Sequence, residues 1–317
     1  MTDEVYMRRC FQIASHGLGR VRPNPMVGCV IVKDEEIVSE GYHQMLGQNH
    51  AERNAILHCL HPEKLEGSTL YCNLEPCSHY GLTPPCADLI VEHKIGRVVC
   101  SCDDPNPKVD GKGFRILQAA GIEVVRHLLE EEGRFLNRRF FTFQEKHRPY
   151  VILKWAESAD GFMAPDYAPF WITNPLLRQL SHRWRTEEAA ILVGSETFIQ
   201  DHPQLNARLW KGTDPTPVVL DRSGRIDPSE LTPHWLHLAT ENAVSTLDAL
   251  YEKNLQSFIV EGGAKVLHSF LQSGQVDEIR ILRSPQCFGS GLKAPHINAT
   301  PHHIETYSDN TVSYYYC

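Results

Sequence analysis

Short apolar runs of strand length alternate with amphipathic stretches of helical length from one end of the chain to the other. Such alternation is typical of α/β proteins, in which helices cover a central sheet. In the first part of the chain, strands are expected at 27–32, 37–41, 69–73, 97–100 and 122–126, and helices at 4–15, 50–60, 87–93, 112–120 and 128–143. This order predicts layers of helices packed on a mixed sheet.

A second α/β pattern begins directly after the polar segment 144–149. Strands are expected there at 151–155, 189–193, 217–220, 257–261 and 277–282, and helices at 176–188 and 264–271. A chain of 317 residues is long enough for two domains that each bury a core. We therefore expect one domain at residues 1–147 and another at residues 148–317.

The charge balance argues against a nucleic-acid partner. The chain has 31 Lys and Arg residues against 39 Asp and Glu residues, whereas proteins that grip a phosphate backbone present a basic face. The apolar runs fall well below the ~18 consecutive residues that a membrane span needs, and the first residues lack a positive and then apolar secretory signal. We expect a cytoplasmic protein with no nucleic-acid or membrane partner.

The chain contains 10 cysteines. In the reducing cytoplasm, cysteine near histidine indicates metal binding before it indicates a disulfide. Most of the thiols lie in apolar strand-like or helix-like stretches and are expected to be small buried hydrophobes: Cys10, Cys29, Cys59, Cys72, Cys100 and Cys102.

One group of residues has the composition of a catalytic zinc site. His50 opens a predicted helix, Cys77 follows a predicted strand, and Cys86 comes nine positions later. One imidazole and two thiolates leave the fourth tetrahedral position to water, whose pKa zinc lowers to about 7. Glu52 then carries protons between that water and a leaving amine. Because three ligands and a water fill the site, no ligand role is expected for His43, His58 or His79.

Each of these residues taken singly has an ordinary explanation. A lone histidine such as His50 is more often a capping or surface residue, and Glu52 alone is an acid favoured by the helix dipole. Zinc deaminases of bases combine a His-x-Glu segment with a Pro-Cys-x-x-Cys segment. Here the first segment is intact, but eight residues separate Cys77 from Cys86.

That longer insert resembles the deaminase domain of a family of bifunctional riboflavin-biosynthesis enzymes. These enzymes join a diaminohydroxyphosphoribosylaminopyrimidine deaminase to a 5-amino-6-(5-phosphoribosylamino)uracil reductase. The matching segments occur in family order at 23–30, 41–43, 50–52, 75–86 and 104–107. The resemblance implies a cytidine-deaminase-like three-layer domain in which Asn24 helps to hold the pyrimidine.

The second half lacks a Gly-x-Gly-x-x-Gly segment after a strand, so a Rossmann dinucleotide site is not supported. Segments 154–161, 171–173, 194–197, 201–208 and 261–263 instead resemble the reductase half of the same family, which is similar in fold to dihydrofolate reductase. The segment 167–170 departs from the family, which usually has a serine before the Trp-Ile-Thr at 171–173, and Ala159 replaces a usual leucine. The stretch 221–257 is also short.

The resemblance implies binding roles for residues of the second half. NADPH is expected to contact Ala156, Trp171, Thr197, Asp201 and the segment that starts at Gly263. The phosphorylated substrate is expected to contact Lys154, Arg185, Leu205, Arg208 and Glu261. Two glycines between a strand and a helix let main-chain N–H groups approach a phosphate, and arginine offers paired donors to one.

By this resemblance the chain is a bifunctional enzyme. Its first domain hydrolyses the exocyclic amine of 2,5-diamino-6-(5-phosphoribosylamino)pyrimidin-4-one with zinc, and its second reduces the ribosyl group of the product to ribityl with NADPH. Two alternatives stay open. One is a nucleic-acid base deaminase with an unrelated second domain, and the other is a non-catalytic protein in which zinc only stabilises the fold. The sequence leaves a homo-oligomer open.

Overall fold

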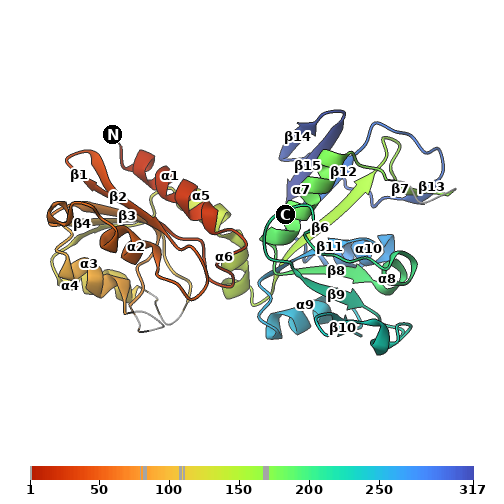
Figure 1. The fold of residues 1–317 in the computed structure, drawn as a ribbon, viewed down its shortest axis with the longest axis horizontal. Helices are drawn as coiled ribbons and strands as arrows, with labels where there is room; N and C mark the ends of the chain where they lie inside the picture. Colours follow the sequence, from red (N-terminus) through yellow and green to blue (C-terminus); the bar gives the residue numbers. More distant parts are fainter. Residues whose placement is uncertain (1, 79, 81–83, 107–108, 110, 167–170) are drawn as a thin grey trace. The chain divides into compact units, whose positions relative to one another are not determined.

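The computed structural model describes residues 2–78, 80, 84–106, 109, 111–166 and 171–317. It consists of two compact units, Met1–Lys146 and His147–Cys317, each built on its own sheet (Figure 1). No helix in the described parts of the chain is long and apolar enough to cross a membrane.

A five-stranded sheet in the order β2-β1-β3-β4-β5 forms the centre of the first unit. β1 runs antiparallel to β2 and to β3, whereas β3, β4 and β5 are parallel. The strands are β1 (Gly28–Lys33), β2 (Glu36–Tyr42), β3 (Thr69–Leu74), β4 (Arg97–Cys102) and β5 (Glu123–Val125). The helices are α1 (Asp3–Ala14), α2 (Ala51–Leu57), α3 (Cys86–Glu92), α4 (Lys112–Ala119), α5 (Glu130–Leu136) and α6 (Arg138–Glu145).

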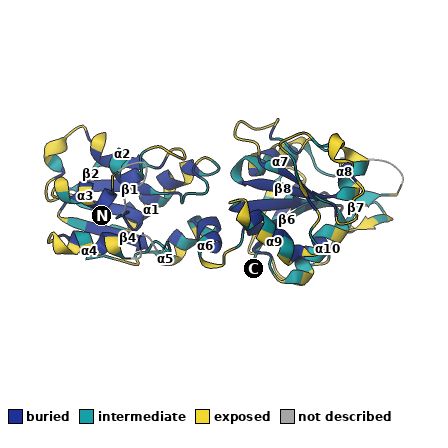
Figure 2. Ribbon diagram, turned by 90° about the horizontal axis from the view of Figure 1, so that it is seen from below, coloured by how far each residue is buried: buried dark blue, intermediate teal, exposed yellow. Residues whose placement is uncertain are grey.

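Side chains of the central strands alternate between two cores, one on each face of this sheet. Ile31, Leu70 and Val98 pack against α2, α3 and α4. Val30, Tyr71 and neighbouring residues pack on the opposite face against α1. The buried strands therefore lie between helical layers (Figure 2), and the expected three-layer domain is confirmed. The six cysteines expected to be buried are all buried.

The prediction of a single helix at 128–143 was wrong, because two helices occupy this segment with a break at Asn137. The Asn137 side chain is turned to the main chain of Met26, where Oδ1 accepts from the N–H at 2.8 Å and Nδ2 donates to the carbonyl at 2.8 Å. Asparagine side chains that bond to main-chain groups commonly interrupt helices.

The second unit contains an eight-stranded sheet in the order β10-β9-β8-β11-β6-β12-β15-β14. In this order, every strand from β10 through β9, β8, β11 and β6 to β12 is parallel to its neighbours. β15 and β14 then add an antiparallel edge. These strands are β6 (Tyr150–Glu157), β8 (Ala190–Gly194), β9 (Thr216–Leu220), β10 (Leu236–Leu238), β11 (Ser257–Glu261), β12 (Glu278–Arg283), β14 (His303–Tyr307) and β15 (Asn310–Tyr316). A separate pair consists of β7 (Phe162–Pro165) and β13 (Gly291–Lys293).

Helices cover both faces of this sheet. They are α7 (Pro175–Glu187), α8 (Ser195–Asp201), α9 (Ala243–Glu252) and α10 (Ala264–Ser273). α9 and α10 pack on one face of the sheet, while α7 and α8 pack on the other. The parallel strands are buried on both faces and carry continuous apolar runs, as in β8 and β11.

Candidate active sites

The first site lies where β3 ends and where α2 and α3 begin. His50 directly precedes α2, Cys86 is the first residue of α3, and Cys77 lies in the segment between β3 and α3. His50 is 27 residues from Cys77 and 36 from Cys86, and the α/β topology brings the three residues together at the carboxyl end of β3. Helix starts and strand ends commonly form the sites of α/β proteins.

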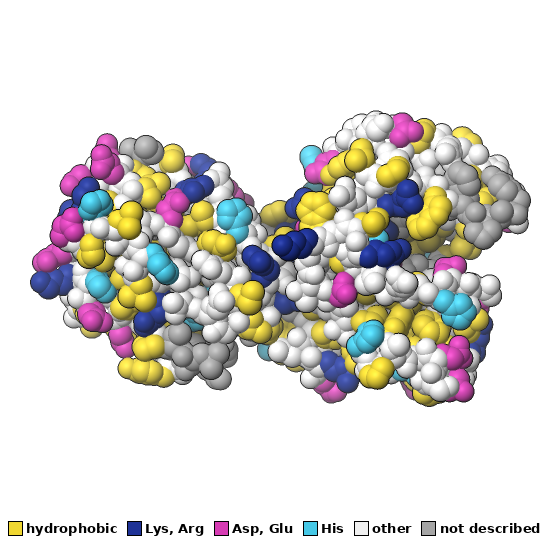
Figure 3. All heavy atoms as spheres, in the orientation of Figure 1, with side chains coloured by type: hydrophobic (Ala, Val, Ile, Leu, Met, Phe, Trp, Pro, Cys, Tyr) yellow, Lys and Arg dark blue, Asp and Glu magenta, His cyan; other side chains and the backbone are white. Residues whose placement is uncertain are grey.

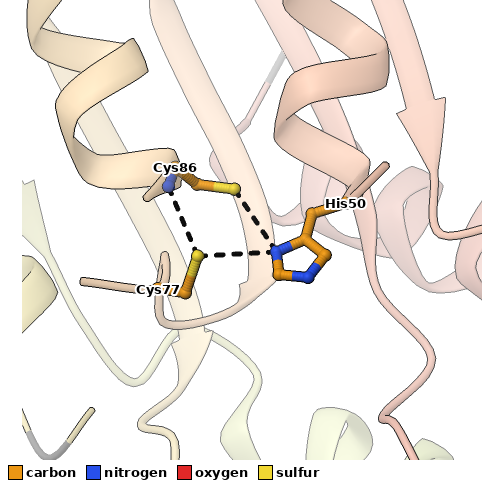
Figure 4. Close-up of side chains that lie close together, drawn as sticks. All are labelled: His50, Cys77 and Cys86. Carbon is orange, nitrogen blue, oxygen red and sulfur yellow. Dashed lines mark hydrogen bonds between the residues drawn. The ribbon is translucent and has the colours of Figure 1, made fainter. Parts of the chain in front are cut away.

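The three candidate ligands face one another across a short gap (Figure 4). The Nδ1 atom of His50 lies 3.4 Å from Sγ of Cys77 and 3.5 Å from Sγ of Cys86. All three ligand atoms lie within 4.8 Å of one another, and the described part of the chain offers no other such cluster. One imidazole nitrogen and two sulfurs at this spacing fit zinc with one position left for water.

The two thiols are not equivalent in their acidity. The pKa of the Cys77 thiol is lowered to about 4 because the Cys86 thiol, the His50 ring and the Cys86 main-chain N–H all donate to its sulfur. The pKa of Cys86 is raised by the same contact with Cys77 and by burial. The pocket therefore already stabilises thiolate, which is the form that binds a metal.

Glu52 lies two residues after His50 in the first turn of α2, and its side chain is only 3% exposed. Burial, and then the charge of Cys77, raises the pKa of its carboxyl to about 6. A carboxyl with a pKa near neutrality can both accept and donate a proton at working pH. Glu52 is thus suited to proton transfer beside the metal ligands.

Asn24, the candidate pyrimidine contact, lies in the segment before β1 and is half-buried. Its Nδ2 atom is 3.3 Å from Nε2 of His43, and the His43 ring meets the His50 ring edge-on at 5.6 Å between centroids. Asn24 is therefore connected to the metal pocket through His43. Nδ1 of His58, the residue directly after α2, lies 2.9 Å from the carbonyl of Asn54. His79 lies outside the described residues.

The second site is centred on a buried ion cluster in the second unit. Glu261 at the end of β11 stands opposite Lys154 of β6 in the strand register. Its carboxylate lies 3.7 Å from Nζ of Lys154 and 2.8 Å from Nη2 of Arg185. Burial alone would raise the pKa of Glu261, but the two cations lower it to about 2, while burial lowers the pKa of Lys154.

A close main-chain approach follows Glu261. Gly262 and Gly263 have positive φ angles of 105° and 74°, and a Cβ atom on either would lie 3.3 Å from the Thr197 side chain. Glycine is therefore favoured at both positions by conformation, and the missing side chains leave main-chain groups accessible beside Thr197. Such a cradle fits the phosphates of a nucleotide cofactor such as NADPH.

The remaining candidates of the second half are placed less closely together. Leu205 is buried with a positive φ, and Arg208 donates to the Asn206 side chain at 3.1 Å. Ala156 packs beside α7. Among the described residues, Asp201 and Trp171 make no hydrogen bond or ion pair with the other candidates. Trp171 is 69% exposed and lies under the guanidinium of Arg178. The segment 167–170, whose sequence departs from the family pattern, lies outside the described residues.

Two contributors to these sites were missed in the sequence. The main-chain carbonyl of Asn206 accepts from Nη1 of Arg185 at 2.9 Å, which ties the 205–208 segment to the ion cluster. His43 contacts both Asn24 and His50, although it was set aside as a ligand. Its place in the matching segment 41–43 was the available signal.

Comparisons with known proteins give a family match for each unit. The model of the cytidine and deoxycytidylate deaminase zinc-binding region matches residues 1–102, and the model of the RibD C-terminal domain matches residues 149–312. The second match rules out an unrelated appended domain.

Acidic and basic side chains are mixed on the face of each unit that Figure 3 displays. A protein that binds nucleic acid instead presents a predominantly basic face.

Relatives that match along almost the whole chain support the same family. The chain is 39% identical to the riboflavin biosynthesis protein RibD of Actinobacillus pleuropneumoniae, over 91% of this chain and 85% of that protein. It is 36% identical to RibD of Escherichia coli (strain K12), over 92% of this chain and 90% of that protein. A solved deaminase/reductase structure from Thermotoga maritima superposes with a TM-score of 0.89 at 37% identity, covering 98% of this chain and 97% of that one.

Proposed function

The chain belongs to the RibD family of bifunctional riboflavin-biosynthesis enzymes, and from this premise we propose how its residues divide the two reactions. It is a zinc-dependent deaminase and an NADPH-dependent reductase. We assign deamination of 2,5-diamino-6-(5-phosphoribosylamino)pyrimidin-4-one to the first unit, and reduction of the deaminated ribosyl compound to the second. The convergence of His50, Cys77 and Cys86 beside buried Glu52 supports this division most strongly. The cytoplasm, which keeps thiols reduced, suits these ligands.

In the first unit, His50, Cys77 and Cys86 would hold the zinc ion. Zinc bound by three protein ligands lowers the pKa of a water in its fourth position to about 7. Glu52 accepts the proton that the attacking water gives up and delivers it to the exocyclic amine, which leaves as ammonia. Asn24 would hold the pyrimidine with its amine-bearing carbon toward Glu52 and the three metal ligands.

In the second unit, Thr197 and the main chain at Gly262 and Gly263 would hold NADPH, which supplies the hydride. Arg185 and Arg208 bind the ribose phosphate as charge-assisted donors. Lys154 stands beside Glu261 in a buried site, where it would orient the ribosyl group and supply a proton to the ring oxygen as the bond from that oxygen to C1 breaks; C1 is then the carbon that receives the hydride. The remaining proposed contacts are Ala156, Trp171 and Asp201 for the cofactor and Leu205 for the substrate.

One incubation tests the proposal. The full chain is mixed with the diaminopyrimidine ribose phosphate, with and without NADPH, and the products are analysed by mass. Without NADPH we expect only the deaminated ribosyl product with release of ammonia. With NADPH we expect the ribityl product, which is heavier by two hydrogen atoms. Recovery of unchanged substrate in both arms, from a protein loaded with zinc, would contradict the proposal.

A further inference from the structure

The main chain that carries Asn24 is fixed by two buried amides. Met26, two residues on, exchanges both of its main-chain hydrogen bonds with the Asn137 side chain. Its carbonyl also accepts from Nδ2 of Asn73 at 2.9 Å, while Oδ1 of Asn73 accepts from the N–H of Gly28 at 2.7 Å. Asn24 is therefore presented from a segment that has little freedom to shift, so the orientation of its side chain decides what it offers.

That orientation is set by His43, which is 3% exposed. Nδ1 of His43 lies 3.0 Å from the main-chain carbonyl of Asn49. A carbonyl oxygen can only accept, so Nδ1 carries the hydrogen and donates it. The buried ring faces the Asn49 carbonyl and the Asn24 amide, and neither is a carboxylate that would pair with a charged imidazolium. A buried charge without such a partner is costly, so the ring is neutral and Nε2 is left as an acceptor.

The group of Asn24 that faces Nε2 of His43 at 3.3 Å must then be the amide NH2. The other end of the amide, Oδ1, has no hydrogen bond with any described residue. We propose that His43 is a positioning residue of the deaminase site, which binds the NH2 group of Asn24 and thereby leaves Oδ1 of Asn24 as an acceptor for an N–H or amino group of the heterocycle. This inference rests on the proposed function of the first unit.

The consequence is a rule for the ligand. A pyrimidine with a hydrogen-bond donor at the position that meets Asn24 is bound, and one with an acceptor there meets a second acceptor. The diaminopyrimidinone carries several N–H and amino groups and suits this polarity. A site that offers an acceptor binds a ligand with a donor at that position. It rejects a ligand with an acceptor there, because a buried polar group would then be left without a hydrogen bond.

Two substitutions separate positioning from simple support. H43Q places an amide near the position of the histidine Nε2, so it can still accept from Asn24, but it gives up the bond to Asn49. H43N keeps a donor near the position of Nδ1 for Asn49, but it does not reach Asn24. We expect H43N to lower kcat/KM for deamination about tenfold or more and H43Q to lower it less, with zinc content and reductase activity of the full chain unchanged. A larger loss in H43Q would overturn the proposal, because it would show that His43 matters only as an anchor for Asn49.

H58N is the matched control, since His58 also bonds through Nδ1 to a main-chain carbonyl, that of Asn54, whereas the Asn24 side chain bonds to His43 among the described residues. Its deamination should equal that of the wild type. In an N24A background, H43N should have little further effect, because His43 acts through Asn24; a full additional loss would contradict this.

The tautomer itself gives a measurement that does not depend on activity. Long-range ¹H–¹⁵N NMR of the zinc-loaded full chain, with the His43 signal assigned from H43N, should show a neutral ring protonated on Nδ1. A ring protonated on Nε2 would overturn the proposal even in a chain that deaminates. A chain with the Nδ1 tautomer but no deamination would instead contradict the proposed function and leave the orientation of Asn24 supported.

Discussion

Lys154 of β6 and Glu261 of β11 stand opposite each other in the parallel register, with Nζ of the lysine 3.7 Å from the carboxylate. Both side chains are largely buried, and Arg185 places a second cation 2.8 Å from the same carboxylate, so the cluster holds one more positive charge than negative. Breaking a buried ion pair costs more free energy than breaking an exposed one. The arrangement fixes charged groups in place before any substrate binds.

We expect Lys154→Ala to impair reduction by at least about tenfold and to leave deamination intact, because Lys154 belongs to the second unit while all metal ligands lie in the first. Separate assays of ammonia release and NADPH oxidation on the same preparation check this. Arg183→Ala, which removes an exposed pair with Glu187 on α7, serves as the control and should change neither rate. Equal loss of both activities in Lys154→Ala would indicate a folding defect instead.

Glu52→Gln should retain zinc and slow deamination by roughly 10²- to 10⁴-fold, the scale of a lost acid–base group. The amide keeps the size of the side chain in its buried position but cannot accept a proton from water. Metal analysis together with single-turnover ammonia release measures both properties. An unchanged rate with zinc in place would mean that another group moves the proton.

Deamination should also fall on the acid side of about pH 6. Burial raises the pKa of Glu52 to about 6, so its carboxyl stays protonated to a higher pH than an exposed glutamate. Since only the carboxylate can accept a proton from water, kcat/KM should rise with pH up to this value and then level off. The pH dependence of kcat/KM is measured, and zinc content is followed at each pH. A loss of activity with its midpoint near pH 4, with zinc retained, would contradict the role of Glu52 as the proton acceptor.

Metal removal should separate the two activities. A chelator should abolish ammonia release and leave NADPH-dependent reduction of the deaminated intermediate unchanged, and added zinc should restore the first activity. Cys77→Ser should behave like the chelated protein without being rescued, because a hydroxyl replaces the thiolate of lowest pKa. Loss of reduction on chelation would place a metal requirement in the second unit as well.

The parts of the fold that the sequence predicted are those with strong local patterns. The strand at 257–261 agrees with β11, and the helices at 4–15 and 176–188 differ from α1 and α7 by a residue or so. Their apolar periodicity and caps are local properties of the chain. The metal ligands could be proposed for the same reason, since imidazole and thiols in a matching order limit the chemistry.

Features that depend on distant contacts could not be predicted in this way. The break at Asn137 follows from bonds to Met26, which is 111 residues away. β14 and β15 were missed because their pairing at the sheet edge is decided by tertiary contacts as much as by propensity. Likewise, the polarity of Asn24 depends on His43 and through it on Asn49, which no spacing in the sequence reveals.

The two units should fold independently of each other. In the first, Phe140 and Phe141 of α6 pack in a cluster with Leu74 and Cys102 of the same unit, so the apolar face of α6 has partners there. In the second, the salt bridge between Arg148 and Asp277 closes the start of β6 at 2.6 Å. A cut just before Arg148 keeps both of these arrangements whole, and each fragment retains its own sheet and cores.

We therefore expect residues 1–147 to bind zinc and deaminate, and residues 148–317 to reduce the deaminated intermediate with NADPH. His147 lies 3.2 Å from the Tyr251 hydroxyl in an exposed contact of the second unit, so a second pair cut after residue 146 tests whether that contact matters; we expect the two pairs to behave alike because an exposed bond contributes little. Solubility and both activities are measured for each fragment alone and after mixing. Aggregation of residues 1–147, relieved by co-expression with the second fragment, would show that the first unit exposes an apolar surface when alone and that the two reactions, though carried by different residues, depend on one jointly folded chain.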